Sequence, residues 1–154
     1  MTDVELSSLL SDLHVTANKL NSETTGVNTV IDSVEARLVQ MNLGLECWLA
    51  GANDHDQPLD LKHPSKDTRL EVQLGFAKVG GDWFLVIREV RYDYQKQSDE
   101  WIEVGETSVT RLQSASRDIR IKALKLLPEL ISSLKEKAEA DTAVILDAKK
   151  MLGW

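Results

Sequence analysis

A cluster of acidic residues and histidines is the first place in this chain where chemistry could occur. The cluster comprises Asp54, His55, Asp56, Asp60, His63 and Asp67. Imidazole and carboxylate groups are common ligands of divalent metals, so His55, Asp56 and His63 are candidate ligands, and segment 54–67 is a candidate site of a small-ligand or metal-dependent enzyme. Their spacing matches no established metal motif, however. A solvated loop explains the same composition, and we therefore expect no metal or other cofactor.

A second candidate is a basic patch in segment 111–125. It comprises Arg111, Arg117, Arg120, Lys122 and Lys125. Arg117 and Arg120 are three residues apart, so on a helix they share one face and could bind a phosphate or a nucleic-acid backbone. The formal net charge of −7 makes nucleic acid an unlikely partner. The competing interpretation is that the patch pairs with the acidic N-terminal part of the same chain, where ten acidic residues precede position 61 against Lys19 and Arg37.

No recognised catalytic motif is present. Cys47 is the only cysteine, and its alternation with Leu45 and Leu49 indicates a structural thiol on the inward face of a strand. A lone cysteine cannot form an internal disulfide, which favours a reducing, cytoplasmic location. The sequence contains neither a signal peptide nor an apolar stretch long enough to span a membrane. A non-enzymatic protein with no membrane contact is therefore expected.

A long apolar repeat dominates the N-terminal third of the chain. It alternates spacings of four and three through Leu6, Leu10, Leu13, Ala17, Leu20, Thr24, Val27, Ile31, Val34, Leu38, Met41 and Leu45. Such a heptad pattern is typical of a helix that buries one stripe against a long partner. It predicts a helix over 3–43, roughly 60 Å long at about 1.5 Å per residue. Its candidate partner-binding residues are Leu10, Leu13, Leu20, Val27, Ile31, Val34 and Leu38.

The weak point of this helix is the run 21–26, which is rich in residues with low helix propensity and ends in Gly26. A helical hairpin that turns at Gly26 is one interpretation. Because Val27 and Ile31 continue the apolar register, a single helix is favoured.

The middle of the chain predicts a four-stranded antiparallel β-meander over 45–112, with a surface loop from 51 to 67. Apolar alternation predicts a hairpin over 70–94 with a three-residue loop, which sets Val79 opposite Trp83 and Glu71 opposite Arg91. Near the turn both faces are apolar. We therefore expect a second cover over Trp83, Leu85 and Ile87, either this chain's own helix or a partner.

The C-terminal segment predicts another long helix over 114–152, with a kink caused by Pro128. The fold class is therefore α+β in a single domain, 1–154, with a long N-terminal heptad helix, the meander and a kinked C-terminal helix. Both helices are expected on one face of the sheet.

The function that these features favour is a protein-interaction or assembly module. It would form a homodimer or small oligomer through its coiled-coil-like N-terminal helix, and a protein is the expected partner. The alternatives are the enzyme built on segment 54–67 and the anion-binding protein that uses Arg117 and Arg120.

Overall fold

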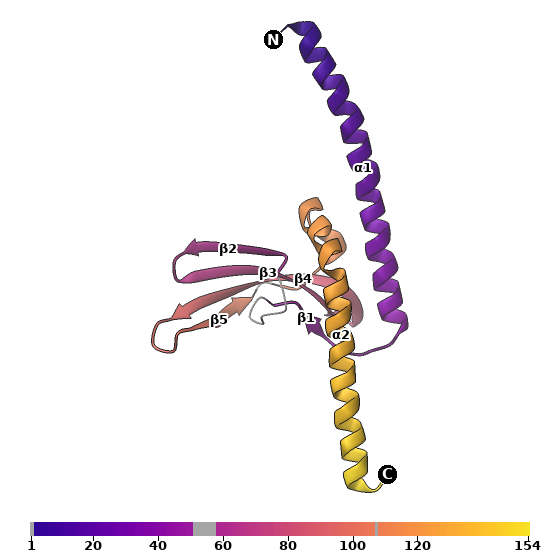
Figure 1. The fold of residues 1–154 in the computed structure, drawn as a ribbon, viewed down its shortest axis with the longest axis vertical. Helices are drawn as coiled ribbons and strands as arrows, with labels where there is room; N and C mark the ends of the chain where they lie inside the picture. The colour runs from indigo at the N-terminus through magenta and orange to yellow at the C-terminus, as the bar shows by residue number, and fades with distance from the viewer. Residues whose placement is uncertain (1, 51–57, 107) are drawn as a thin grey trace.

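The computed structural model describes residues 2–50, 58–106 and 108–154. Two long helices lie at the two ends of the chain, with a curled antiparallel sheet between them (Figure 1), which confirms the α+β class. In chain order the elements are α1 (Asp3–Gln40), β1 (Cys47–Trp48), β2 (Asp60–Ser65), β3 (Thr68–Val79), β4 (Asp82–Gln95), β5 (Glu100–Glu106), β6 (Thr110–Arg111), the short 3-10 helix η1 (Leu112–Ser114) and α2 (Arg117–Leu152).

Helix α1 runs without interruption through Gly26, so the single helix is the alternative observed. Thr2 and Glu5 begin it with a capping box, in which the Thr2 N–H donates to the Glu5 carboxylate at 2.8 Å and the Glu5 N–H donates to the Thr2 hydroxyl at 3.2 Å. The helix ends at Gln40 rather than at 43, because Asn42, with a φ of 52°, has already left the helical conformation.

The sheet is built around the β3–β4 hairpin. Strands β1 and β2 pair with β3, while β5 and β6 pair with β4, all antiparallel. The predicted loop over 51–67 is wrong in its second half, because β2 (Asp60–Ser65) lies there. This edge strand exposes nearly all its side chains and contains Pro64, so it carries no apolar alternation that could reveal it.

The predicted hairpin register is wrong by one residue. Gly80 and Gly81 have φ angles of 61° and 94°, as a two-residue type I′ turn requires, so Val79 lies opposite Asp82 instead of Trp83. Glu71 consequently lies opposite Val90, and its ion pair is with Arg69 on its own strand, at 2.9 Å, instead of with Arg91. A shift of one residue gives every side chain a different partner on the opposite strand. The predicted pair of Glu71 with Arg91 therefore does not form.

Both helices contribute to one apolar core on one face of the sheet. Leu74, Phe76 and Leu85 project from that face and are buried together with side chains of both helices, namely Ile31, Leu38, Leu126, Leu127, Leu130 and Leu134. Trp83 and Ile87 pack against the edge of the same core. The shifted register places Trp83, Leu85 and Ile87 on the same face as Phe76, so the helices cover this one face and are not a second cover. Pro128 lies inside α2, and the kink and the coiled-coil character of the helices stay predictions.

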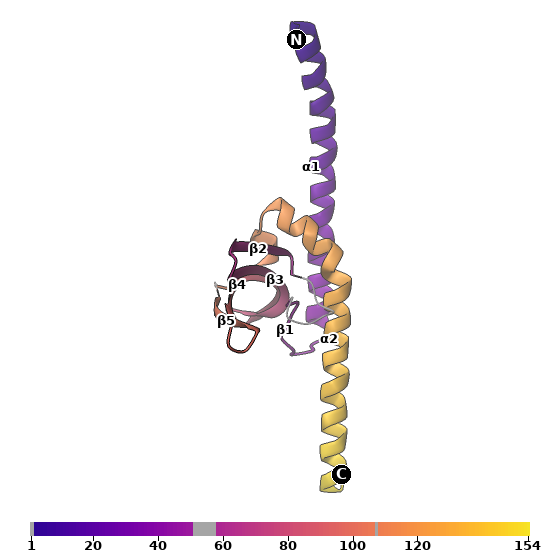
Figure 2. The same cartoon turned by 60° about the vertical axis from the view of Figure 1, so that its left-hand side comes forward.

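The opposite side of the sheet, here called the inner face, carries a group of polar side chains beside buried apolar ones such as Val86 and Val90, and the sheet curls around it (Figure 2). Glu71 and Gln73 are fully buried there. Gln73 Nε2 donates to the Tyr92 hydroxyl at 3.0 Å, and Arg88 Nε donates to Gln73 Oε1 at 3.0 Å. The Arg69 guanidinium stands 4.8 Å from the centre of the Tyr92 ring and pairs with Glu71. Gln73 Nε2 also donates to Glu71 Oε1 at 3.3 Å, which joins these contacts into one continuous network.

Trp48 of β1 closes one end of the inner face. A methyl group at position 75 would lie 2.4 Å from its ring, so only glycine lets the indole pack on β3 at this point. Arg88 stacks on the other side of that indole, 4.0 Å from its centre. Gly75 therefore fixes where β1 joins the sheet.

The two tyrosines of the chain are expected to ionise at unusually high pH. Burial raises the pKa of Tyr92 above 10.0, although the hydrogen bond from Gln73 opposes this, and the hydrogen bond to Asp99 raises the pKa of Tyr94. Because its folded pKa exceeds the unfolded value, neutral Tyr92 contributes stability that is present below pH 10 and is lost as the pH rises through the folded pKa.

In the Tyr94→Phe variant, the phenolate absorbance of Tyr92 should reach its midpoint at a higher pH in the folded protein than in the urea-unfolded chain. Coincident midpoints would contradict the burial of Tyr92.

Candidate partner-binding surface

The second half of α1 is attached to the body of the molecule. The Glu35 carboxylate accepts from the backbone N–H of Leu85 at 2.9 Å and from the Arg111 guanidinium at 3.3 Å. The apolar side chains of this half pack in the core, namely Val27, Ile31, Val34 and Leu38. These four predicted partner-binding residues thus contact their own chain, as do Trp83, Leu85 and Ile87.

The first half of α1 extends beyond the rest of the chain. Helix α2 begins beside Asn21, whose side-chain oxygen accepts from Arg117 Nη2 at 3.1 Å. Residues 3–20, here called the α1 arm, lie past that point (Figure 1). The remaining predicted partner-binding residues are on this arm, and Leu10, Leu13 and Leu20 are 56%, 60% and 45% exposed. Three large side chains on one helical stripe are therefore open to solvent.

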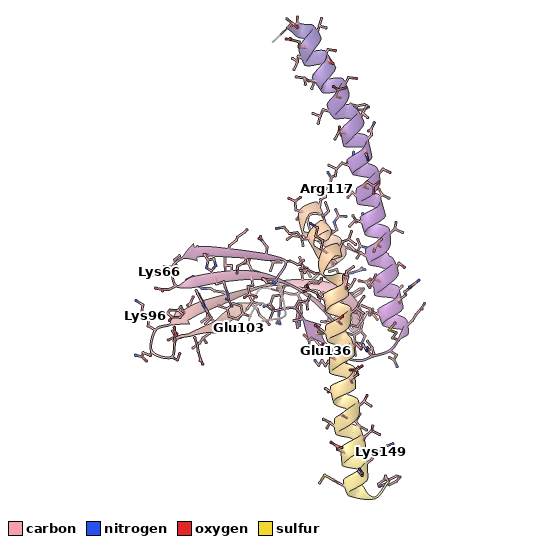
Figure 3. The ribbon with its side chains drawn as sticks, viewed as in Figure 1. Lys66, Lys96, Glu103, Arg117, Glu136 and Lys149 are labelled. Carbon is pink, nitrogen blue, oxygen red and sulfur yellow. The ribbon has the colours of Figure 1, made fainter. Side chains whose placement is uncertain are left out.

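Helix α2 has a similar extension at the other end of the molecule. Met41, just past the end of α1, and Ala138 line the same groove, so residues 139–152, here called the α2 arm, continue beyond α1 (Figure 1). Its large apolar side chains are exposed, namely Val144, Ile145, Leu146, Met151 and Leu152. Figure 3 shows the side chains of both arms projecting into open space, with Lys149 near the tip of the α2 arm.

The α2 arm was not predicted as a partner-binding surface. The signal was present, because Ala138, Ile145 and Leu152 follow one another at intervals of seven. Helices α1 and α2 are displaced along the long axis, so α1 does not cover this part of α2. This stagger is visible only in the structure.

An apolar groove of about 410 Å³ lies where the α2 arm leaves the body. Val34, Leu38, Leu43, Ile131 and Leu134 are among the apolar residues that line it. Its two charged residues, Arg37 and Lys135, are both basic. The groove can therefore accept an apolar side chain whose neighbours are acidic.

No protein-family model, curated protein or solved structure matches this chain. Neither helix, over the residues that the structure describes, has an apolar stretch that would let it cross a membrane.

The predicted metal site is only partly within the described residues, since His55 and Asp56 lie outside them. His63 is on β2, where its ring centre is 6.2 Å from that of Trp101. Asp60 pairs with Lys122 at 3.6 Å. Over residues 2–50, 58–106 and 108–154, no three potential metal ligands of the His, Cys, Asp and Glu types come together.

The two arginines of the predicted anion site both face α1. Arg117 bonds Asn21, and Arg120 donates to the side chain of Asn28 and, at 3.2 Å, to the backbone carbonyl of Ala115. These bonds tie the start of α2 to α1. Anion binding through Arg117 and Arg120 would have to compete with them.

Proposed function

We propose that this protein is a non-enzymatic assembly module that self-associates through the α1 arm in a coiled-coil-like contact. The observation that carries the proposal is the exposure of Leu10, Leu13 and Leu20 on one continuous helix beyond the body. A helix as long as the α1 arm is marginal in water when it stands alone, because most helical stability comes from packing of an apolar face. A partner that covers the stripe supplies that packing.

The free energy gained by burying the exposed leucines can be compared with the free-energy cost of association. Burying one fully exposed leucine side chain contributes about 1.5–3 kcal/mol, and each copy supplies three leucines that are about half exposed, so all six contribute roughly 5–9 kcal/mol. Association costs an estimated 4–15 kcal/mol in lost freedom. A contact made only by these three leucines is therefore marginal. A stable assembly needs additional apolar surface beyond the α1 arm.

Replacing Leu10 or Leu13 by aspartate should convert the oligomer to monomer. Each change removes a buried leucine and places a charge in an apolar contact, which should weaken association about 100-fold or more. Size-exclusion chromatography with light scattering over a concentration series measures the mass. The core should stay intact, because both leucines are exposed within one chain, and circular dichroism should lose no more helix than the uncovered α1 arm contributes.

Ser8→Asp is the matched control, because it adds the same charge to the same arm on the opposite side of the helix. This variant should associate like the unmodified protein. A chain that remains monomeric at every concentration would overturn the proposed function, and so would an oligomer that neither leucine variant weakens.

A further inference from the structure

We infer that the α1 arm of one copy packs antiparallel against the α2 arm of a second copy, and that the exchange is reciprocal. The inference rests on the proposed function and names its partner as a second copy of this chain. The two arms point to opposite ends of the long axis (Figure 1). A twofold rotation that turns one copy end for end therefore brings each α1 arm beside the α2 arm of the other copy.

The lengths of the two arms differ by only about one helical turn. The α1 arm has 18 residues and the α2 arm has 14, which correspond to about 27 Å and about 21 Å of helix. When Asp3 is placed beside Leu152, counting inward along antiparallel helices puts Leu10 beside Ile145. The exposed stripes of both arms then cover each other. The contact then buries the exposed apolar side chains of the α2 arm as well as the three leucines.

Charge supports the antiparallel direction. Asp3 and Glu5 lie in the first turn of α1, and Lys149 and Lys150 lie in the last turn of α2. The antiparallel arrangement places these pairs together and sets the positive end of one helix dipole beside the negative end of the other. A parallel, head-to-tail arrangement would instead bring Lys149 and Lys150 to the base of the α1 arm, near Lys19. It would also leave free ends and grow into a filament.

The apolar groove at the base of the α2 arm fits the same alignment. Counting inward from the paired tips, Leu20 of the second copy reaches the level of Lys135, one of the residues that line the groove. Glu23, one turn further along α1, then approaches the basic pair of Arg37 and Lys135. An apolar side chain with an acidic neighbour is the occupant that this groove accepts. Pairing of two α1 arms would leave both the groove and the α2 arm uncovered.

The α2 arm can be tested separately from the α1 arm. Ile145→Asp should weaken dimerisation about 100-fold or more, as Leu10→Asp does, because both residues belong to one contact. Ala143→Asp is the matched control, since it adds the same charge to the other side of α2 and should leave the dimer intact. Sedimentation velocity and light scattering report the state of each variant.

A charge exchange tests which ends meet. Reversing Asp3 to lysine, or Lys150 to glutamate, should weaken the dimer severalfold at low salt, and Glu5 is kept because its carboxylate caps the helix. Combining both reversals in one chain should restore the dimer, because each reversed end meets a reversed partner. Restoration requires contact between the two ends, so a merely structural effect of the substitutions would not produce it.

The outcomes separate this inference from the proposed function. If Leu10→Asp gives monomer and Ile145→Asp leaves the dimer intact, self-association stands and the reciprocal exchange is overturned in favour of paired α1 arms. Filaments of increasing mass would overturn the closed dimer in favour of head-to-tail packing. A charge exchange that restores nothing would overturn the antiparallel alignment. A monomeric unmodified chain would remove the proposed function itself.

Discussion

Replacing Glu71 by alanine is expected to destabilise the fold by about 3–5 kcal/mol, because the change leaves the Arg69 guanidinium without its buried counter-ion. Glu71 is fully buried on the inner face, and its carboxylate lies 2.9 Å from Arg69 Nη2. It also accepts a hydrogen bond from Gln73 at 3.3 Å. A loss of this size is a large fraction of the 5–15 kcal/mol that stabilises a typical domain. Urea unfolding followed by tryptophan fluorescence measures it.

Two comparison variants separate the charge from the side chain. Glu71→Gln keeps the shape and one acceptor oxygen, so it should be less destabilising than alanine. Glu100→Ala removes an exposed carboxylate from β5 and should change stability by no more than about 0.5 kcal/mol. If Glu71→Ala proved as stable as Glu100→Ala, the inner-face network would have no structural role.

Phe76→Ala is the second large effect, with an expected loss of about 3–5 kcal/mol. The Phe76 ring is 1% exposed and stacks on Trp83 at a centroid distance of 5.2 Å. It lies in the core between the sheet and both helices, so its removal leaves a cavity in the centre of the fold.

The chain has one other phenylalanine, which provides the matched control. Phe84 is half-buried and is covered by the Arg111 guanidinium, 4.1 Å from the ring centre. Phe84→Ala should therefore cost clearly less in the same urea titration. Equal losses at the two positions would show that burial in the helix-facing core does not decide the effect.

The helices were predictable because each carries a long periodic signal. The apolar register continues across Gly26, and the structure shows one helix there. The sheet was less predictable where the signal was local. The hairpin register depended on whether Gly80 and Gly81 form the whole turn, which the apolar pattern alone does not decide. Strand β2 was missed because its side chains are exposed and lack alternation.

The candidate surface could be only half predicted. Its leucines are part of a seam that looks uniform in the sequence, yet Leu13 is exposed and Ile31 is buried. The difference depends on where α2 begins relative to α1, and the Arg117–Asn21 contact that marks this point joins residues far apart in the chain. The α2 arm was missed for the same reason. How far one helix is displaced along the other depends on tertiary contacts, and the apolar pattern of either helix alone does not predict it.

The stagger also determines how this molecule would carry mechanical load. The two termini lie at opposite ends of the long axis, and the helices overlap only in the middle (Figure 1). Tension applied between the termini would pull α1 and α2 past each other along their axes. The Arg117–Asn21 and Arg111–Glu35 contacts and the apolar side chains between the helices would then be loaded together, in shear. The contacts in the overlap would therefore resist the tension together. The force needed to separate α1 from α2 would increase with the length over which the two helices are in contact.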